Sequence, residues 1–312
     1  MVVSWVYWSA IDLISAISVK SVANNRHRKQ NDISSHSLRD SGRSRYTKLQ
    51  VLAMLLADKV ILISGVGPGL GQSMAKIAVQ EGAKVALGAR NIEFLQKLVG
   101  ELTNSGGEAI AVATDVTDRL QCDAIAQATV EAFGSIDGLV NSAYNHGNWA
   151  TADQADAEEW ARVYDVNCVG ALRMAQAVLP AMKSAGSGAI VNVSTMATVN
   201  PFPGEASYAA SKGGLGVLTR HMATDFGQFN IRVNAARMGW IGGAPVYHYI
   251  DAQVKSGRDR DEVVGEITKR IALGIIPSEP DCAKSVLYFV SDYSKVVSGA
   301  TLDVNGGEYM AP

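Results

Sequence analysis

The chain has 312 residues, of which 47% are hydrophobic and 19% charged, and its formal net charge is −2. This composition excludes a wholly disordered, collagen-like or coiled-coil chain, and the charge gives no support to nucleic-acid binding as the main function. The cysteines are few and far apart, so we predict no disulfide scaffold, no metal site and a reducing, cytoplasmic location. They are Cys122, Cys168 and Cys282.

The first fifty residues differ in kind from the rest, because they hold eight Lys or Arg residues against three Asp. An apolar run over 2–19 precedes a basic, serine-rich tract, which leaves a membrane anchor over the first 20 residues as one alternative. Asp12 and the short run count against an anchor, and no Lys or Arg precedes the run as a secretory signal requires. We therefore predict a poorly ordered N-terminal extension over 1–53 and a single domain over 54–312.

From residue 60 onward, short apolar runs rich in β-formers alternate with stretches long enough for helices. Most runs are apolar on consecutive residues, which is typical of strands buried on both faces. Helices are predicted over 70–81 and 206–226, and another over 281–291 follows two prolines. This alternation predicts an α/β fold, a doubly wound parallel sheet of about seven strands with helices on both faces. The predicted strands are 60–64, 84–87, 109–113, 138–141, 189–193, 231–235 and 300–304.

A glycine-rich turn joins the first predicted strand to the first predicted helix. Glycines allow a tight turn and a close approach of the backbone to a pyrophosphate, and a helix N-terminus presents free N–H groups to an anion. The context on both sides therefore favours a dinucleotide-binding turn over an ordinary glycine-rich loop. Its candidate residues are Ser64, Gly65, Gly69, Leu70 and Gly71.

The end of the second predicted strand bears on which dinucleotide binds. An NAD site usually has an acidic residue about 20 residues after the glycine motif, to accept a hydrogen bond from the ribose 2′-hydroxyl. This region has no acid, and Arg90 is well placed to bind a 2′-phosphate, unless it is only a solvated arginine. We therefore predict NADP(H) as the preferred cofactor, with NAD(H) also possible.

A tyrosine and a lysine stand at i and i+4 in the long helix over 206–226. Tyr208 and Lys212 share one helix face, and a nearby ammonium is expected to lower the pKa of a phenol from its usual value. Tyr208 could then exchange a proton with an alcohol or a carbonyl as hydride moves to or from a nicotinamide. Upstream, a strand ends in two hydroxyl residues, Ser194 and Thr195.

In their order and spacing, these motifs resemble those of the short-chain dehydrogenase/reductase family, over about 54–309. The resemblance implies a Rossmann-type fold and a catalytic set in which the hydroxyl lies 13 residues before the tyrosine, at Thr195, with Ser194 as the alternative. It also implies that Lys212 holds the nicotinamide ribose and that Asn167 holds a water of the proton relay. The implied catalytic residues are Asn167, Thr195, Tyr208 and Lys212, and further cofactor contacts are Asp115, Val116, Asn141 and Ala143.

The chain departs from the family pattern at three places. Tyr144 stands where a glycine normally lets the chain pass the cofactor, and Met238-Gly239 replaces the usual Pro-Gly after the sixth strand. Pro68 stands inside the glycine turn where some NADP-dependent members carry a basic residue. The NADP prediction therefore depends on Arg90 alone.

The segment over about 240–270 looks longer than in compact family members, and we expect it to form a lid over the nicotinamide. Aromatic residues in it, and others after the fourth strand, are expected to face the same cleft, which suits a bulky or ring-bearing substrate. The alternative is that half of them only pack the lid. The substrate-binding candidates are Tyr144, Trp149, Trp240 and Tyr247.

The resemblance thus implies an NADP(H)-dependent oxidoreductase that transfers a hydride between the nicotinamide and a secondary alcohol or ketone, bulky or cyclic, with Tyr208 as the acid/base. One alternative is a 3-oxoacyl-thioester (acyl-carrier-protein) reductase. Another is a non-catalytic dinucleotide-sensing module, which is disfavoured because a sensor has no reason to keep all four catalytic residues together. The resemblance also implies a homotetramer or homodimer with a small-molecule substrate and no nucleic-acid partner.

Overall fold

The computed structural model of the chain describes residues 54–311. The expected N-terminal extension, with its anchor and secretory alternatives, lies outside the described residues. Within 54–311 no helix combines the length and the apolar character that a membrane crossing requires.

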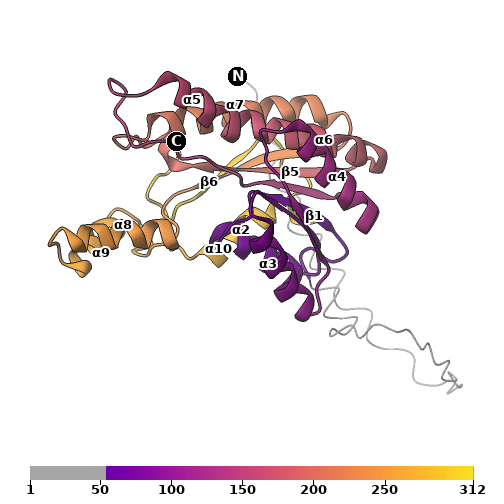
Figure 1. Cartoon of the computed structure of the whole chain (residues 1–312), viewed down its shortest axis with the longest axis horizontal. Helices are drawn as coiled ribbons and strands as arrows, with labels where there is room; N and C mark the ends of the chain where they lie inside the picture. The colour runs from indigo at the N-terminus through magenta and orange to yellow at the C-terminus, as the bar shows by residue number, and fades with distance from the viewer. Residues whose placement is uncertain (1–53, 312) are drawn as a thin grey trace, which may run out of the picture. The chain divides into compact units, whose positions relative to one another are not determined.

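The core of the fold is one sheet of seven parallel strands in the order β3-β2-β1-β4-β5-β6-β7 (Figure 1). The predicted α/β class, the strand number and the parallel pairing are confirmed. The strands are β1 Val60–Ser64, β2 Lys84–Ala89, β3 Ala109–Ala113, β4 Gly138–Asn141, β5 Gly188–Thr195, β6 Ile231–Met238 and β7 Thr301–Val304.

Three strands run further than their apolar sequence suggests, and the first of them, β2, continues to Ala89. β5 continues through Ser194 to Thr195, and β6 continues to Met238, because the two strands pair residue by residue up to Thr195 and Met238. Backbone hydrogen bonds of a parallel ladder do not depend on apolar side chains. The extra length carries Thr195 to the carboxyl edge of the sheet.

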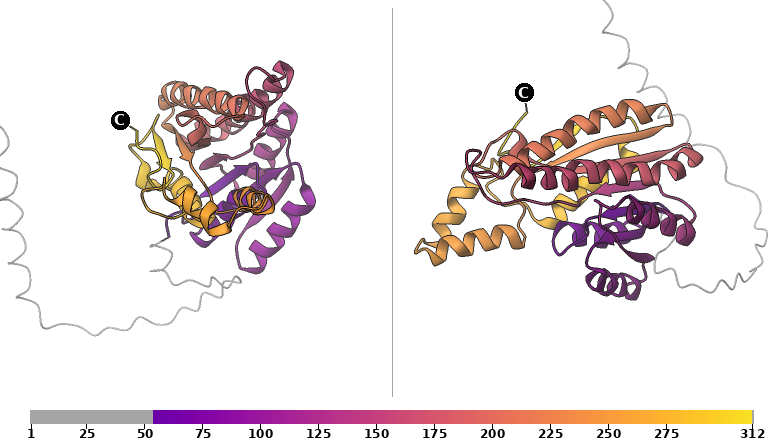
Figure 2. Two further views of the ribbon diagram at one scale, coloured as in Figure 1. Left: turned by 90° about the vertical axis from the view of Figure 1, so that its left-hand side faces the viewer. Right: turned by 45° about the horizontal axis from the view of Figure 1, so that its top comes forward.

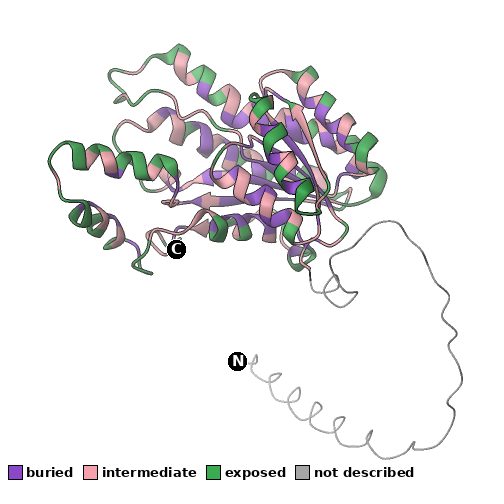
Figure 3. Cartoon of the chain, turned by 60° about the horizontal axis from the view of Figure 1, so that its bottom comes forward, coloured by how far each residue is buried: buried purple, intermediate pink, exposed green. Residues whose placement is uncertain are grey.

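Helices cover both faces of the sheet, and each face has its own hydrophobic core. On one face α2, α3 and α10 pack over residues such as Ile61, Ile63 and Leu87. On the other face α4, α6 and α7 pack over Leu62 and Ala86 (Figures 1 and 2). Figure 3 shows the same division as buried strands inside and exposed outer helix faces. The helices are α2 Leu70–Gln80, α3 Ile92–Asn104, α4 Arg119–Phe133, α5 Ala157–Tyr164, α6 Gly170–Ala185, α7 Ala206–Gly227 and α10 Glu279–Tyr288.

The strand order reverses at β1, which pairs with β2 on one side and with β4 on the other. In open parallel sheets, ligands bind at the carboxyl ends of the strands where the order reverses. Ser64, Asn141 and Thr195 end β1, β4 and β5 at this edge. The topology thus brings residues from distant parts of the sequence to one crevice.

The segment expected to form a lid folds as two helices, α8 Ala244–Lys255 and α9 Arg260–Thr268, which extend beyond the sheet (Figure 1). Pro245 near the start of α8 suits the first turn of a helix, and Asp259 caps α9 by accepting hydrogen bonds from the Asp261 and Glu262 N–H groups. The two helices enclose a small core of their own. Its buried members are Ile250, Val263, Ile267 and Ile271.

Candidate active site

The turn between β1 and α2 is built as a cradle that only glycine fits. Gly65 and Gly69 have φ of 80° and 111°, a region that residues with a side chain rarely adopt. A Cβ on Gly65 would overlap the backbone of Ala143, and a Cβ on Gly71 would stand 2.9 Å from Cα of Val66. Gly69 offers no side chain to cap α2, so the first-turn N–H groups of this helix suit an anion.

Asn141, predicted to contact the cofactor, is buried and holds the edge of the sheet together. Its amide nitrogen donates to the Ala171 carbonyl at 3.2 Å and to Oδ1 of Asn192 at 2.9 Å, and its oxygen accepts from the Ser64 hydroxyl at 3.3 Å. Asn192 in turn donates to the Thr219 hydroxyl at 2.9 Å. The side chain therefore ties β4 to β1, β5 and α6.

Arg90 and Asp115 lie at the carboxyl ends of β2 and β3. The N–H groups of Gly65 and Val66 both donate to the Gly88 carbonyl, so the glycine turn contacts β2 at Gly88. Arg90 lies two residues after this contact. Arg90 is exposed. Hydrogen bonds from Thr117 hold the pKa of Asp115 below its usual value, and the charge of Arg90 acts in the same direction.

Tyr208 and Lys212 lie one turn apart in α7 and reach the carboxyl end of β5. The ammonium of Lys212 is buried and donates to the Val193 carbonyl at 2.8 Å. Tyr208 and Thr195 line the same cleft, and the Thr195 hydroxyl acts to lower the pKa of the Tyr208 phenol. Thr195 itself is held in place because its Oγ1 accepts from the Ala197 N–H at 3.2 Å. Thr195 is favoured over Ser194 as the hydroxyl partner of Tyr208, because the Thr195 hydroxyl influences the Tyr208 pKa and Thr195 alone of the two also lines the neighbouring cavity.

The protonation of this pair differs from the sequence-based expectation. Burial raises the pKa of Tyr208, Tyr144 and Glu205 add to the rise, and the Thr195 hydrogen bond acts against it. Burial also lowers the pKa of Lys212 to about 8. The predicted lowering of the Tyr208 pKa is therefore wrong for the chain by itself, because desolvation outweighs the one lowering influence, that of the Thr195 hydroxyl.

Asn167 lies in a π-helical turn, Asp165–Val169, between α5 and α6. Its Oδ1 accepts from the Asn145 N–H at 2.7 Å, and its Nδ2 donates to the Asn145 carbonyl at 2.7 Å and to the Ser211 hydroxyl at 2.9 Å. π-turns occur often at functional sites, where they redirect one side chain within a helix. Here the turn aims Asn167 at the residue that precedes Lys212.

The glycine turn and the hydroxyl residues line one continuous cleft of about 290 Å³, which we call the glycine-turn cleft. Among the predicted site residues it contains Gly65, Gly69, Leu70, Gly71, Tyr144, Thr195, Tyr208 and Lys212. The side chain of Glu279, at the start of α10, also lines it. A Cβ on Gly69 would stand 3.0 Å from Oε1 of Glu279, so a carboxylate lies against the turn.

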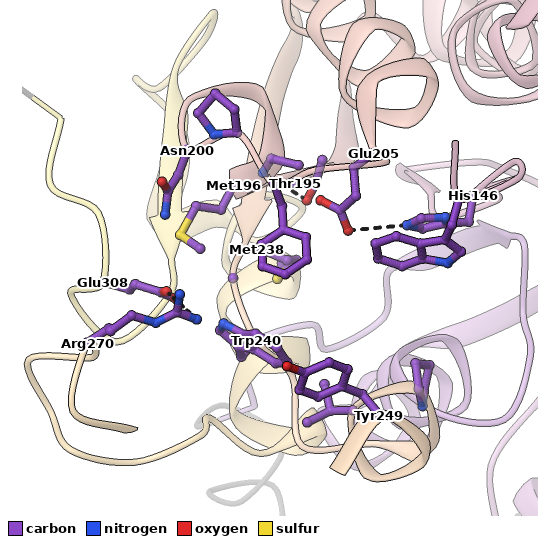
Figure 4. Close-up of a pocket in the computed structure, with 17 residues that line it drawn as sticks. His146, Thr195, Met196, Asn200, Glu205, Met238, Trp240, Tyr249, Arg270 and Glu308 are labelled. Carbon is purple, nitrogen blue, oxygen red and sulfur yellow. Dashed lines mark hydrogen bonds and ion pairs between the residues drawn. The ribbon is translucent and has the colours of Figure 1, made fainter. Parts of the chain in front are cut away.

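A second cavity of about 520 Å³, the aromatic cavity, adjoins this cleft (Figure 4). The two share wall residues, among them His146, Thr195 and Met238. His146 stacks on Tyr208 with ring centroids 4.8 Å apart and on Trp149 at 4.4 Å, and its Nε2 lies 3.3 Å from Oε1 of Glu205. The cavity has apolar walls, which Trp149, Phe202, Trp240 and Tyr249 provide.

Of the substrate-binding candidates, Trp149 and Trp240 line the aromatic cavity and Tyr144 lines the glycine-turn cleft. The structure does not place Tyr247 in either lining. Tyr249 takes that position, because the face of α8 that carries Pro245 and Val246 turns back to the cavity after one helical turn. Four more predicted cofactor contacts line a small internal void next to Lys212, with Asn167 beside them. They are Ser64, Val116, Asn141 and Ala143. Arg90 and Asp115 line none of these three spaces.

Several residues that line the aromatic cavity were not predicted from the sequence. Glu205 precedes Tyr208 by three residues, and its charge in that position was an available signal. Arg270 and Glu308 had no local signal, because only the fold brings them to the cavity. Within 54–311, no group of three His, Cys, Asp or Glu side chains is arranged to hold a metal ion.

Comparison with known proteins places these features among dehydrogenases. The family model described as short chain dehydrogenase matches residues 59–254. The chain is 31% identical over 258 residues to 2,5-dichloro-2,5-cyclohexadiene-1,4-diol dehydrogenase LinX of Sphingobium indicum, covering 82% of this chain and 98% of that one. It is 34% identical to trans-4-hydroxycyclohexanecarboxylate dehydrogenase of Sinomonas cyclohexanicum, covering 81% and 93%. It is 33% identical to the 3-oxoacyl-[acyl-carrier-protein] reductase FabG of Thermotoga maritima, covering 81% and 99%.

Solved structures agree with this picture. Levodione reductase superposes with a TM-score of 0.75 at 29% identity, covering 81% of this chain and 98% of that chain. Xylitol dehydrogenase, solved with NAD+ bound, superposes with a TM-score of 0.75 at 30% identity, covering 81% and 99%.

Proposed function

The chain belongs to the short-chain dehydrogenase/reductase family and is an oxidoreductase acting on CH–OH groups, and from this premise we propose its cofactor, acid/base residue and substrate class. We propose an NADP(H)-dependent enzyme that interconverts a secondary alcohol and a ketone on a bulky or cyclic substrate. One observation carries the proposal. Tyr208 and Thr195 line the cleft that the glycine turn opens, and Thr195 also lines the aromatic cavity beside it.

The residues fit a nicotinamide dinucleotide. Gly65 lets the turn pack directly against the backbone of Ala143, where a Cβ would overlap, and the uncapped start of α2 suits a pyrophosphate. Lys212 follows Tyr208 by one turn of α7, and its buried ammonium donates to the Val193 carbonyl. We assign to this ammonium the binding of the ribose and the stabilisation of negative charge on the phenol. When bound there, a nicotinamide would supply a hydride to the carbonyl carbon of a ketone or accept one from the carbinol carbon of an alcohol.

The proton follows a path through the chain's own side chains. In ketone reduction, Tyr208 donates its hydroxyl proton to the carbonyl oxygen, and the Thr195 hydroxyl donates a hydrogen bond to the same oxygen. In alcohol oxidation, Tyr208 accepts the proton back. Asn167 donates a hydrogen bond to the hydroxyl of Ser211, the residue before Lys212, and so helps to position this part of α7. The high pKa of Tyr208 in the chain by itself means that the phenol is protonated at neutral pH, the form needed for reduction.

The aromatic walls favour a bulky ring over a thin linear chain, because large apolar side chains on several sides bury more of a compact ring's surface. Two relatives carry a ring alcohol in their names, which supports the same choice. A 3-oxoacyl-thioester reductase is the second candidate, since the chain is 33% identical to such an enzyme. For that function, the flexible acyl chain of the thioester would bring its ketone into the same cavity.

A substrate panel separates the two candidates. The purified protein should oxidise NADPH with cyclic ketones and reduce NADP+ with the matching alcohols, as followed by the absorbance of the reduced nicotinamide. An acetoacetyl thioester should be a poor substrate by comparison. A kcat/KM for the thioester above that of every ring ketone would make the thioester reductase the better conclusion, and no turnover with either class would refute both.

The cofactor preference is tested at Arg90. Replacing Arg90 with Asp should lower the ratio of kcat/KM for NADP over NAD by about a hundredfold, because a charge-assisted contact to the 2′-phosphate is worth about 2 to 3 kcal/mol. Lys97→Asp is the matched control, since Lys97 is exposed on α3 and the charge change is the same. An equal fall in both variants would attribute the effect to the general field, and an unchanged ratio would remove Arg90 from the cofactor site.

A further inference from the structure

One end of the aromatic cavity carries a polar pair that the proposed reaction does not use. Arg270 and Glu308 lie together on one side, His146 and Glu205 lie on the opposite side, and Thr195 lies between them (Figure 4). A substrate whose reacting oxygen contacts Thr195 therefore has room to extend toward Arg270 and Glu308. Nothing in the proton path described above requires a charge at that end.

Glu308 is the unusual member of the pair. Its side chain is only 3% exposed, and its Oε1 lies 3.4 Å from Nη2 of Arg270. Its second oxygen, Oε2, is buried and has no hydrogen-bond partner. Leaving a buried acceptor unsatisfied costs about 1 to 3 kcal/mol, more when the group is charged. Because Glu308 lines the cavity, a small rotation of its carboxylate would bring Oε2 to a donor there.

The backbone fixes where Glu308 stands. It follows the turn after β7, in which the Gly307 N–H donates to Oδ1 of the buried Asn305 at 2.8 Å. The Asn305 amide also donates to the Tyr309 carbonyl at 2.9 Å. The turn is thus bonded on both sides of Glu308, which keeps its carboxylate at the cavity wall.

Arg270 limits what the donor can be. Its guanidinium lies 5.9 Å from the ring centroid of Trp240 and is half exposed, so it is placed by the aromatic wall as well as by Glu308. A cationic donor would meet the guanidinium, and an anion would meet the free carboxylate oxygen. A neutral hydroxyl suits both, because it donates to Oε2 and accepts from the guanidinium.

We propose that Glu308 and Arg270 form a recognition site for a second hydroxyl group of the substrate, remote from the carbon that is oxidised or reduced. The substrate class is then a ring diol or the corresponding hydroxyketone. This assignment rests on the proposed function, since it takes the reacting oxygen to lie at Thr195 and Tyr208. It makes Glu308 a specificity-determining residue.

The experiment compares cyclohexane-1,4-diol with cyclohexanol, a pair that differs only in the remote hydroxyl. With NADP+ present, the wild-type enzyme should favour the diol in kcat/KM by about tenfold to a hundredfold, because the analogue leaves Oε2 unpaired. Glu308→Met, which is close in length and has no acceptor, should bring this ratio near one. Glu308→Gln keeps an acceptor without the charge and should restore part of the preference.

Glu262→Gln is the matched control, because Glu262 is an exposed acid on α9 that lines neither cavity. It should keep the wild-type ratio. Thermal unfolding and NADPH binding confirm that each variant is folded. A diol preference that survives in Glu308→Met overturns the proposal, and so does a wild-type enzyme that does not distinguish the two alcohols or that prefers a ring carboxylate to the diol.

Calorimetry separates this result from a failure of the proposed function. If neither alcohol is oxidised by any form of the protein, the reaction assigned above is wrong, and the affinities of the diol and of cyclohexanol are then compared directly. A tighter binding of the diol that Glu308→Met abolishes supports the recognition site without the reaction. Equal affinities of the two compounds refute it.

Discussion

Replacing Tyr208 with Phe should lower kcat by at least about a thousandfold while NADPH affinity changes by less than about twofold. The substitution removes the phenolic hydroxyl in the glycine-turn cleft and keeps the ring that stacks on His146. Packing at the junction of the two cavities is thereby preserved, and only the proton donor is lost. Stopped-flow measurement of hydride transfer and fluorescence titration with NADPH give the two quantities separately.

Tyr293→Phe is the matched control, because it also removes a tyrosine hydroxyl. Tyr293 is 78% exposed and lines neither the glycine-turn cleft nor the aromatic cavity. It should retain wild-type kcat. If Tyr208→Phe also retained it, the proton would have to travel through another group, with His146 as the titratable ring nearest to the phenol.

Replacing Lys212 with Met should abolish measurable turnover and, at the same time, make the chain without cofactor more stable at neutral pH by about 1 to 3 kcal/mol. Lys212 is 2% exposed, and burial lowers the pKa of its ammonium from 10.5 to about 8. An apolar side chain of similar length carries no such desolvation cost. The lost hydrogen bond to the Val193 carbonyl offsets part of the gain.

The sign of the pH dependence follows from the lowered pKa. Below pH 8 the lysine is protonated in the folded and the unfolded chain alike, and the folded state bears the full cost of the buried charge. Between about 8 and 10.5 the folded chain gives up a proton that the unfolded chain keeps, so wild-type stability rises with pH relative to Lys212→Met. Above 10.5 the cost is gone.

Chemical denaturation at pH 7, 9 and 10.5 measures this convergence of the two stabilities. Lys97→Met, at an exposed position on α3, controls for the loss of a lysine as such. A variant at Lys212 that is less stable than wild type at pH 7, or a difference that does not shrink with pH, would show that the ammonium is satisfied in the folded chain.

The sheet and its order of elements could be predicted because they depend on local pattern. Consecutive apolar residues in 60–64 and the glycines that follow are signals within one segment, and the strand and the turn occur where they were expected. The strand ends were less accurate. Ser194 and Thr195 look like a loop in isolation, and only the pairing with β6 extends β5 to include them.

The chemistry of the site depended on information that the sequence does not hold locally. The spacing of Tyr208 and Lys212 predicts one helix face but not the desolvation that raises one pKa and lowers the other. The choice between Tyr247 and Tyr249 needed the rotation of α8 relative to the sheet. Glu308, far along the chain from Thr195, becomes visible only when β7 is in place.

The separate core inside α8 and α9 has an evolutionary consequence. Ile250, Val263, Ile267 and Ile271 hold these helices to each other with little help from the two large cores of the sheet. Substitutions on their cavity side, at positions such as Tyr249, therefore leave the two large cores of the sheet unchanged. Evolution can therefore change substrate preference through sequence changes in α8 and α9, while Thr195, Tyr208 and Lys212 stay the same.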